Sequence, residues 1–117
     1  MIDKSIDLRE LLSRTDASSA RALELFAILN LGLIEALGNG LIDADNALRC
    51  FYHADNCLYV KKIIKNKVAN EVMGRGVQLQ DLFDILPAGQ ARREFLRELA
   101  KMRELCLKML ETQRSVA

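Results

Sequence analysis

Hydrophobic residues recur at the spacing of an α-helix along most of this 117-residue chain. The pattern is clearest in residues 88–114, where apolar side chains follow one another at steps of four, three, four and three positions: Phe95, Leu99, Met102, Cys106 and Met109. This spacing places them on one face of a helix and forms a short heptad seam. The β-branched segment 58–64 resembles a strand on its own, but no segment elsewhere offers it a comparable partner. The pattern therefore predicts an all-α protein.

The other helices are predicted from the same period and from residues that favour helix ends. Before the last helix, we expect helices or helical segments over 5–13, 17–37, 44–54, 58–73 and 79–86. Glycine clusters predict turns at 38–40 and 74–76, and Pro87 predicts the end of the fifth segment. Residues 58–73 either form one helix or break near Asn66. The expected fold is one domain, residues 1–117, built as an irregular or orthogonal bundle of five to six helices with a long C-terminal helix.

Asn30 is the polar exception in the predicted segment 17–37. At 100° per residue it falls on the same side as Phe26 and Ile34, in the middle of the expected core face. A buried amide without partners costs about 1–3 kcal/mol. We therefore predict that Asn30 is hydrogen-bonded in the core, either as ordinary polar satisfaction or as a residue that sets helix register.

The net charge of +1 hides an uneven distribution. Residues 1–57 hold five Lys and Arg against nine Asp and Glu, whereas residues 58–117 hold twelve against seven. Local neutralisation is the favoured explanation, and a basic surface for an anionic partner is the alternative. The densest basic run is Lys61, Lys62, Lys65 and Lys67, and no aromatic residues are interleaved with it for base stacking. A solvated face is favoured there over a nucleic-acid partner.

The cysteines and the single histidine give a weak metal pattern. Cys50, His53 and Cys57 have spacings of three and four residues, and Cys106 on the last helix is a further thiol, but the Cys-x2-Cys knuckle of common zinc sites is absent. We expect these residues to belong to the core and the protein to be free of metal and cofactor, with reduced thiols. An odd number of cysteines without a secretory signal favours the cytoplasm.

Catalytic patterns are missing from the sequence. One histidine excludes a multi-histidine site, and neither a glycine-rich phosphate loop nor a nucleophile elbow is present. The most apolar stretch, 23–37, is too short to span a bilayer and contains charged residues. The sequence therefore predicts a protein that is neither an enzyme nor a membrane protein.

Association is the function class that the helix pattern favours. Ile28 and Leu31 fall on the outward face of segment 17–37, beside Gly32 and Glu35. Leu107 and Leu110 widen the apolar face of the last helix beyond its seam. We take these six residues as interface candidates, without choosing between the two helices, and predict a homodimer. Binding of another protein is the alternative, as is cover of the patch by the first helix.

Two short stretches, residues 31–47 and 76–82, resemble a small bacterial all-helical family of uncharacterised function. Their sequences are LGLIEALGNGLI followed directly by DADNA in the first stretch, and GVQLQDL in the second. The resemblance implies a bacterial cytoplasmic protein and supplies no activity, ligand or site. The sequence thus favours helix-mediated association over catalysis, with a nucleic-acid-associated regulator that uses the basic C-terminal half as the alternative function.

Overall fold

The computed structural model describes residues 5–13 and 19–116, and the regular structure within these ranges is entirely helical. Seven segments follow one another: α1 (Leu8–Ser13), α2 (Ser19–Gly38), α3 (Ala44–Cys50), α4 (Ala54–Tyr59), the π-helical turn η1 (Val60–Ile64), α5 (Lys67–Ile85) and α6 (Ala88–Val116). The predicted all-α bundle with a long C-terminal helix is confirmed. The connection between the predicted helices 5–13 and 17–37 lies outside the described residues.

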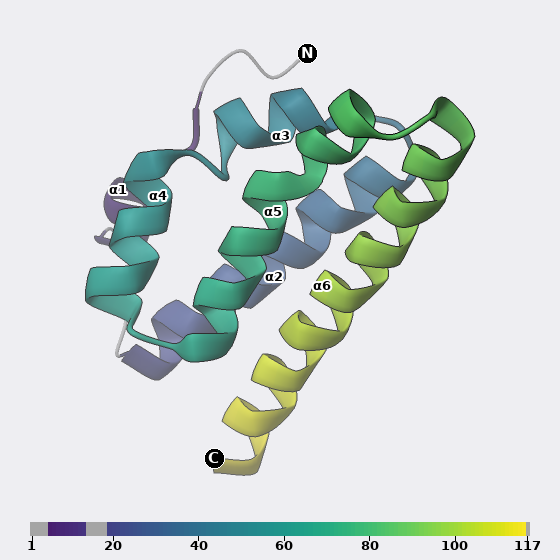
Figure 1. Cartoon of the computed structure of the whole chain (residues 1–117). Coiled ribbons are helices and arrows are strands. Elements are labelled where there is room, and N and C mark those ends of the chain that lie inside the picture. Colours follow the sequence, from purple (N-terminus) through teal and green to yellow (C-terminus); the bar gives the residue numbers. More distant parts are fainter. Residues whose placement is uncertain (1–4, 14–18, 117) are drawn as a thin grey trace.

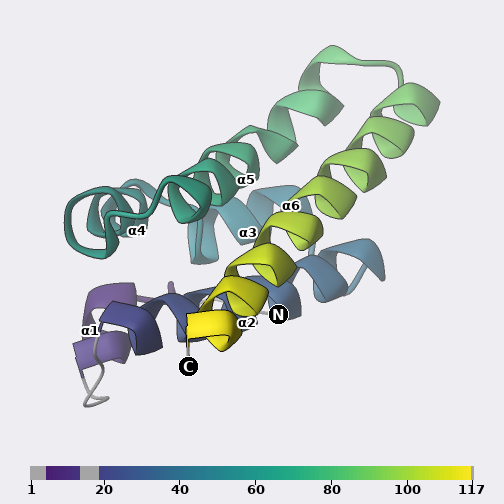
Figure 2. The same ribbon diagram turned by 90° about the horizontal axis from the view of Figure 1, so that it is seen from below.

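The long helices α2, α5 and α6 form the body of the fold (Figures 1 and 2). α6 packs along both α5 and α2, and α3 contacts α5. The predicted heptad seam of α6 is confirmed, because Phe95, Leu99, Met102, Cys106 and Met109 are all buried. At the opposite side of the bundle α1 packs on α4. The core therefore lies between three crossing helices and is closed at one side by short ones.

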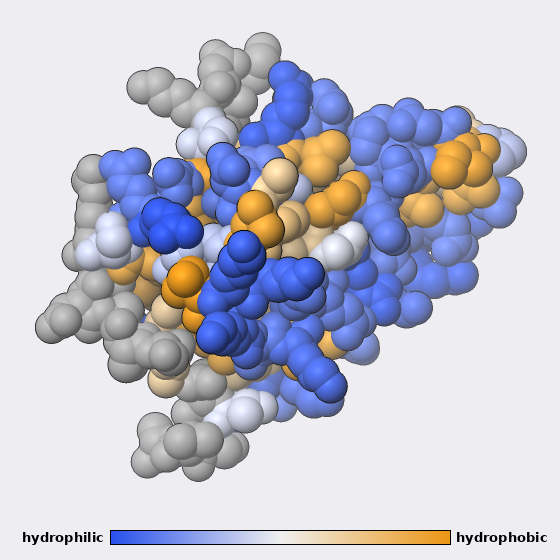
Figure 3. All heavy atoms as spheres, turned by 60° about the vertical axis from the view of Figure 1, so that its left-hand side comes forward, coloured by the Kyte–Doolittle hydropathy of each residue, from blue (hydrophilic) through white to orange (hydrophobic). Residues whose placement is uncertain are grey.

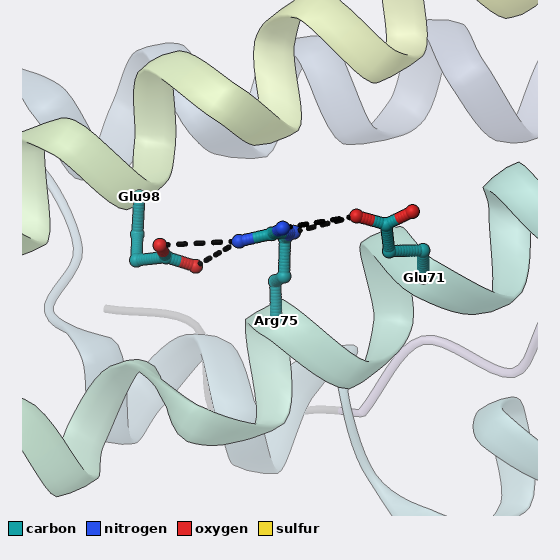
Figure 4. Close-up of polar contacts among 3 residues, drawn as sticks. All are labelled: Glu71, Arg75 and Glu98. Atoms are coloured by element: carbon teal, nitrogen blue, oxygen red, sulfur yellow. Dashed lines mark hydrogen bonds and ion pairs between the residues drawn. The ribbon is translucent and has the colours of Figure 1, made fainter.

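An ion-pair network ties α5 to α6 at their contact (Figure 4). The guanidinium of Arg75 lies between two carboxylates, 2.8 Å from Glu98 on α6 and 3.0 Å from Glu71 on α5. The hydrogen bonds that Arg75 donates to Glu98 and Glu71 raise its pKa. This part of the basic C-terminal half is thus neutralised by acidic residues of the same half.

The turn predicted at residues 74–76 is wrong, because α5 runs through it without a break. Gly76 is buried, and a Cβ atom at this position would lie 2.4 Å from the ring of Tyr52. Glycine is needed here for close packing of helix on ring and not for a turn. The end of the predicted helix 44–54 is also wrong: α3 stops at Cys50, Phe51 and Tyr52 turn into the core, and His53 caps α4.

The break that the sequence allowed near Asn66 is present. η1 ends at Ile64, Lys65 adopts a left-handed backbone with φ of 53°, and the side chain of Asn66 accepts a hydrogen bond from the backbone N–H of Ala69 at 3.0 Å. This side-chain cap starts α5. The segment 58–73 is therefore two helical pieces meeting at a capped corner.

Asn30 is fully buried and hydrogen-bonded, as predicted. Its amide nitrogen donates to the carbonyl of Phe26 at 3.0 Å, and its amide oxygen accepts from the hydroxyl of Tyr52 at 2.9 Å. Tyr52 in turn lies against Gly76 of α5. One buried asparagine thus fixes the ring on which α2, α5 and the end of α3 converge.

A second buried asparagine, Asn56, anchors the N-terminal segment. Its side chain accepts from the N–H of Leu8 at 3.0 Å and donates to the carbonyls of Ile6 at 2.9 Å and Phe51 at 2.8 Å. The helix predicted over 5–13 accordingly begins only at Leu8, because residues 5–7 form an extended strap, with the side chain of Asp7 accepting from the N–H of Glu10.

Candidate functional site

A pocket lies at the corner where two helix connections meet. It has a volume of about 500 Å³ and is bounded by the α2–α3 connection, the end of α5 and the start of α6. Its lining is Leu37, Gly40, Ile42, Asp43, Ala44, Asp45, Gln80, Phe83, Arg92 and Phe95. A concave site of this size with a mixed lining is the usual form of a binding site.

Local helix-end chemistry builds both walls of this pocket. After α2, Gly40 adopts a φ of 73°, a left-handed conformation that glycine tolerates best, and the chain reverses. Asp43 then caps α3 by accepting from the N–H of Asn46 at 2.8 Å. On the other side, the extended backbone at Leu86 and the ring of Pro87 separate α5 from α6. Two sharp corners are thereby held next to each other.

The pocket combines an aromatic wall with one cation that forms no ion pair among the described residues. The rings of Phe83 and Phe95 meet edge to face with centroids 5.1 Å apart, and the guanidinium of Arg92 lies 5.5 Å from the centroid of Phe95. The two carboxylates are already engaged, Asp43 with its cap and Asp45 with Arg49 at 2.9 Å. The pocket can thus take an apolar group and offer Arg92 to a polar one.

The chain segments that bound the pocket also carry the two most exposed large hydrophobic side chains that the structure describes. Leu41, between two pocket-lining residues, is 78% exposed, and Ile85, two residues after Phe83, is 77% exposed. In Figure 3 a group of hydrophobic side chains lies at the far end of the molecule, where α5 and α6 meet. We refer to Leu41, Phe83, Ile85 and the pocket as the corner surface.

The six predicted interface residues lie on α2 and α6, and none of them is among the residues that line the pocket. Ile28 is 51% exposed, and Gly32 faces open space, because a Cβ atom at this position would have no neighbour within 4 Å. Glu35 is exposed and accepts a hydrogen bond from the side chain of Asn39. Leu107 is 42% exposed, whereas Leu31 and Leu110 are half-buried against the core. The first helix packs on α4, so this face of α2 remains open at Ile28 and Gly32.

The three cysteines pack in or beside the core, and His53 caps α4. His53 accepts from the N–H of Asn56 through Nδ1 at 3.4 Å, so Nε2 carries the proton and donates to the carbonyl of Ile6 at 3.0 Å. Burial raises the pKa of the Cys106 thiol to about 12 and also raises the pKa values of Cys50 and Cys57. Across the described ranges, no three His, Cys, Asp or Glu side chains are grouped in a way that would hold a metal ion.

The sequence alone does not reveal the corner surface. Leu41 and Ile42 are typical of residues that pack a turn, and Ile85 belongs to no helical stripe. The sequence does show apolar residues beside two predicted helix ends, Leu41 and Ile42 at one and Ile85 at the other, that belong to no buried helical face. That signal cannot show that the two ends lie together, because residues 37–45 and 80–95 are distant in the chain.

Comparison with known proteins gives a family and no activity. A family model described as "Protein of unknown function (DUF3969)" matches residues 18–117. No curated protein and no solved structure matches the chain. Over the residues that the structure describes, none of the helices has both the length and the apolar character needed to cross a membrane.

Proposed function

This chain belongs to that family of proteins of unknown function, and from this premise we propose that it is a non-enzymatic protein that associates with a second copy of itself through the corner surface. The observation that carries the proposal is the position of Leu41 and Ile85. These two strongly exposed apolar side chains belong to the two segments, the α2–α3 connection and the end of α5, that bound a pocket of about 500 Å³.

A two-fold interface requires one surface to supply both halves of each contact. The corner surface does so, since it has protruding apolar side chains and a recess with an aromatic wall. In a dimer, Leu41 or Ile85 of each copy would enter the pocket of the other and lie against Phe83. Arg92 would remain at the edge, where a polar rim is typical of interfaces.

The expected gain is sufficient for a reversible dimer. Burying one Leu or Ile side chain contributes about 1.5–3 kcal/mol, and symmetry doubles each contact. Association costs several kcal/mol in lost rotational and translational freedom. Four such contacts are worth about 6–12 kcal/mol, which is of the same order as this cost, so the dimer should be reversible and should dissociate on dilution.

Sedimentation equilibrium at micromolar concentration tests the proposal. The wild-type chain should sediment as a dimer, and the double variant Leu41→Glu, Ile85→Glu as a helical monomer. Leu58→Glu is the matched control, because Leu58 is an exposed apolar residue on α4 and lies outside the corner surface. A wild-type chain that remains monomeric at these concentrations would contradict self-association.

The outward face of α2 is the second candidate for the same function. Ile28 is exposed, and the open space beside Gly32 permits close approach of another backbone. A dimer that persists in the corner variant and is lost in Ile28→Glu, with helicity retained, would assign the interface to this face. Persistence in both variants would leave α6, with Leu107 and Leu110, as the predicted route.

The nucleic-acid-associated alternative has less support. Within the described residues, Arg75 is paired with Glu71 and Glu98, and Arg97 is paired with Glu94. These pairs reduce the basic surface available for tracking a phosphate backbone. A salt-dependent gel shift with duplex and single-stranded oligonucleotides would revive this alternative.

A further inference from the structure

Three lysines line one small depression at the corner between η1 and α5. The depression has a volume of about 170 Å³, and its lining is Lys61, Lys65, Asn66, Lys67 and Asn70. The left-handed backbone at Lys65 turns the chain so that lysines before and after the corner border the same space. We infer that this depression is a binding site for a phosphate group carried by a small molecule or a lipid headgroup.

The charges around the depression are not compensated by the protein. No carboxylate is among its lining residues, and the described residues supply no ion-pair partner for Lys61, Lys65 or Lys67. Glu71, the next carboxylate along α5, is engaged with Arg75. Like charges held around one space repel one another, so a dianion placed between them is attracted by all three.

The hydrogen-bonding groups also favour an oxyanion. The ammonium groups are donors without acceptor capacity, and the exposed side-chain amide of Asn70 adds further N–H donors. Asn66 already uses its side-chain oxygen to cap α5, so that oxygen is directed at the helix. The volume of about 170 Å³ excludes a large ligand from full enclosure. One phosphate group with a few waters fits.

Exposed apolar side chains lie on the elements next to the depression, so the phosphate could belong to a soluble ester or to a lipid headgroup. Figure 3 shows hydrophobic side chains next to hydrophilic ones on the face formed by α4 and η1. Leu58 and Ile63 are exposed on these elements. A soluble phosphate ester would use the lysines alone, whereas a lipid headgroup would also bring these apolar side chains to a bilayer surface. The phosphate chemistry is common to both, and this site is independent of the corner surface.

Amide chemical shifts of the whole chain, titrated with inorganic phosphate, test the site. Sodium chloride at equal ionic strength serves as the reference. We expect saturable shifts at residues 61–70, and a loss of affinity of about tenfold in the variant Lys61→Gln, Lys67→Gln. The matched control is Lys101→Gln, Lys108→Gln, which removes the same charge from exposed positions on α6 and should bind as the wild type does.

Flotation with vesicles separates the two sources. Binding to vesicles with phosphatidic acid, lost in the Lys61 and Lys67 variant and weakened by Ile63→Ser, would assign a lipid headgroup. Phosphate binding without flotation would assign a soluble phosphate ester. The inference is overturned if phosphate shifts no more resonances than chloride does, or if the two lysine variants bind phosphate equally well.

Discussion

The α3–α4 junction differs from the corner surface in how its side chains are covered. The junction buries its aromatic and polar side chains, whereas the corner surface leaves apolar side chains exposed. At the junction, residues 51–56 bury two aromatic rings and Asn56, and the described part of the chain leaves no buried side-chain nitrogen or oxygen there without a partner. At the corner, Leu41 and Ile85 are exposed beside an open pocket. In Figure 1 these regions lie at the two ends of α3.

The difference shows where the chain completes its own core and where it does not. Buried amides are stabilising only when all their hydrogen bonds are made. The junction therefore requires its partners on residues 5–7, α2 and α5 to be in place. Exposed apolar side chains at a recess gain free energy only when something covers them. Substitutions at the junction should therefore change folding, and substitutions at the corner should change association.

The largest effect is expected from Asn56→Ala. This change leaves the N–H of Leu8 and the carbonyl of Phe51 without the partner they have in the buried junction. With about 1–3 kcal/mol for each unsatisfied group, the free energy of unfolding should fall by about 3–5 kcal/mol in urea denaturation. Asn39→Ala is the control, since Asn39 is exposed and bonds only within its own turn. Equal losses of unfolding free energy in Asn56→Ala and Asn39→Ala would contradict the claim that the α3–α4 junction depends on its buried hydrogen bonds.

A smaller but still clear effect is expected from Gly76→Ala. The added methyl group would overlap the ring of Tyr52, which is buried and held by Asn30. Overpacking of this kind costs about 1–3 kcal/mol. Gly32→Ala is the matched control: it lies in open space on α2 and should stabilise by about 0.5–1 kcal/mol through helix propensity. Thermal unfolding followed by circular dichroism compares them, and a stabilised Gly76→Ala variant would contradict the packing argument.

Tyr52→Phe isolates the hydrogen bond from the ring. The variant keeps the aromatic packing and removes the donor to the amide oxygen of Asn30, which is fully buried. We expect a loss of about 1–2 kcal/mol in the free energy of unfolding. Tyr59→Phe should change stability by less, because Tyr59 is only half-buried and its ring contacts Arg9. Equal stability of the two variants would contradict the prediction, because it would mean that the hydrogen bond from Tyr52 to Asn30 makes no net contribution.

The smallest effect on folding is expected at the corner. Ile85→Ser removes an apolar side chain that is already exposed, so the monomer should change in stability by less than about 0.5 kcal/mol. Denaturation at a concentration low enough to dissociate dimers measures this value. A loss comparable to that of Tyr52→Phe would show that Ile85 supports the fold and would weaken its assignment to association.

Helical periodicity predicted most of the fold because side chains on one helix face must share one environment. The seam of α6 and the burial of Asn30 follow from local spacing, whereas the sequence left open whether the chain breaks near Asn66. Glycine misled the prediction at Gly76, because the same residue serves for turns and for close packing, and only the position of the Tyr52 ring distinguishes them. The end of α3 was missed for a related reason, since Phe51 and Tyr52 continue a helical pattern while their rings turn into the core.

The sequence by itself determined the class of fold, the long last helix and which faces of the helices are buried, since these depend on residues a few positions apart. The tertiary structure decided which distant helix ends meet. It placed the α2–α3 connection beside the end of α5 and the start of α6 and so created the corner pocket, and it gave the strap at residues 5–7 its partners at the α3–α4 junction. Such contacts join side chains dozens of residues apart, and their formation depends on the packing of the whole core, which no local spacing records.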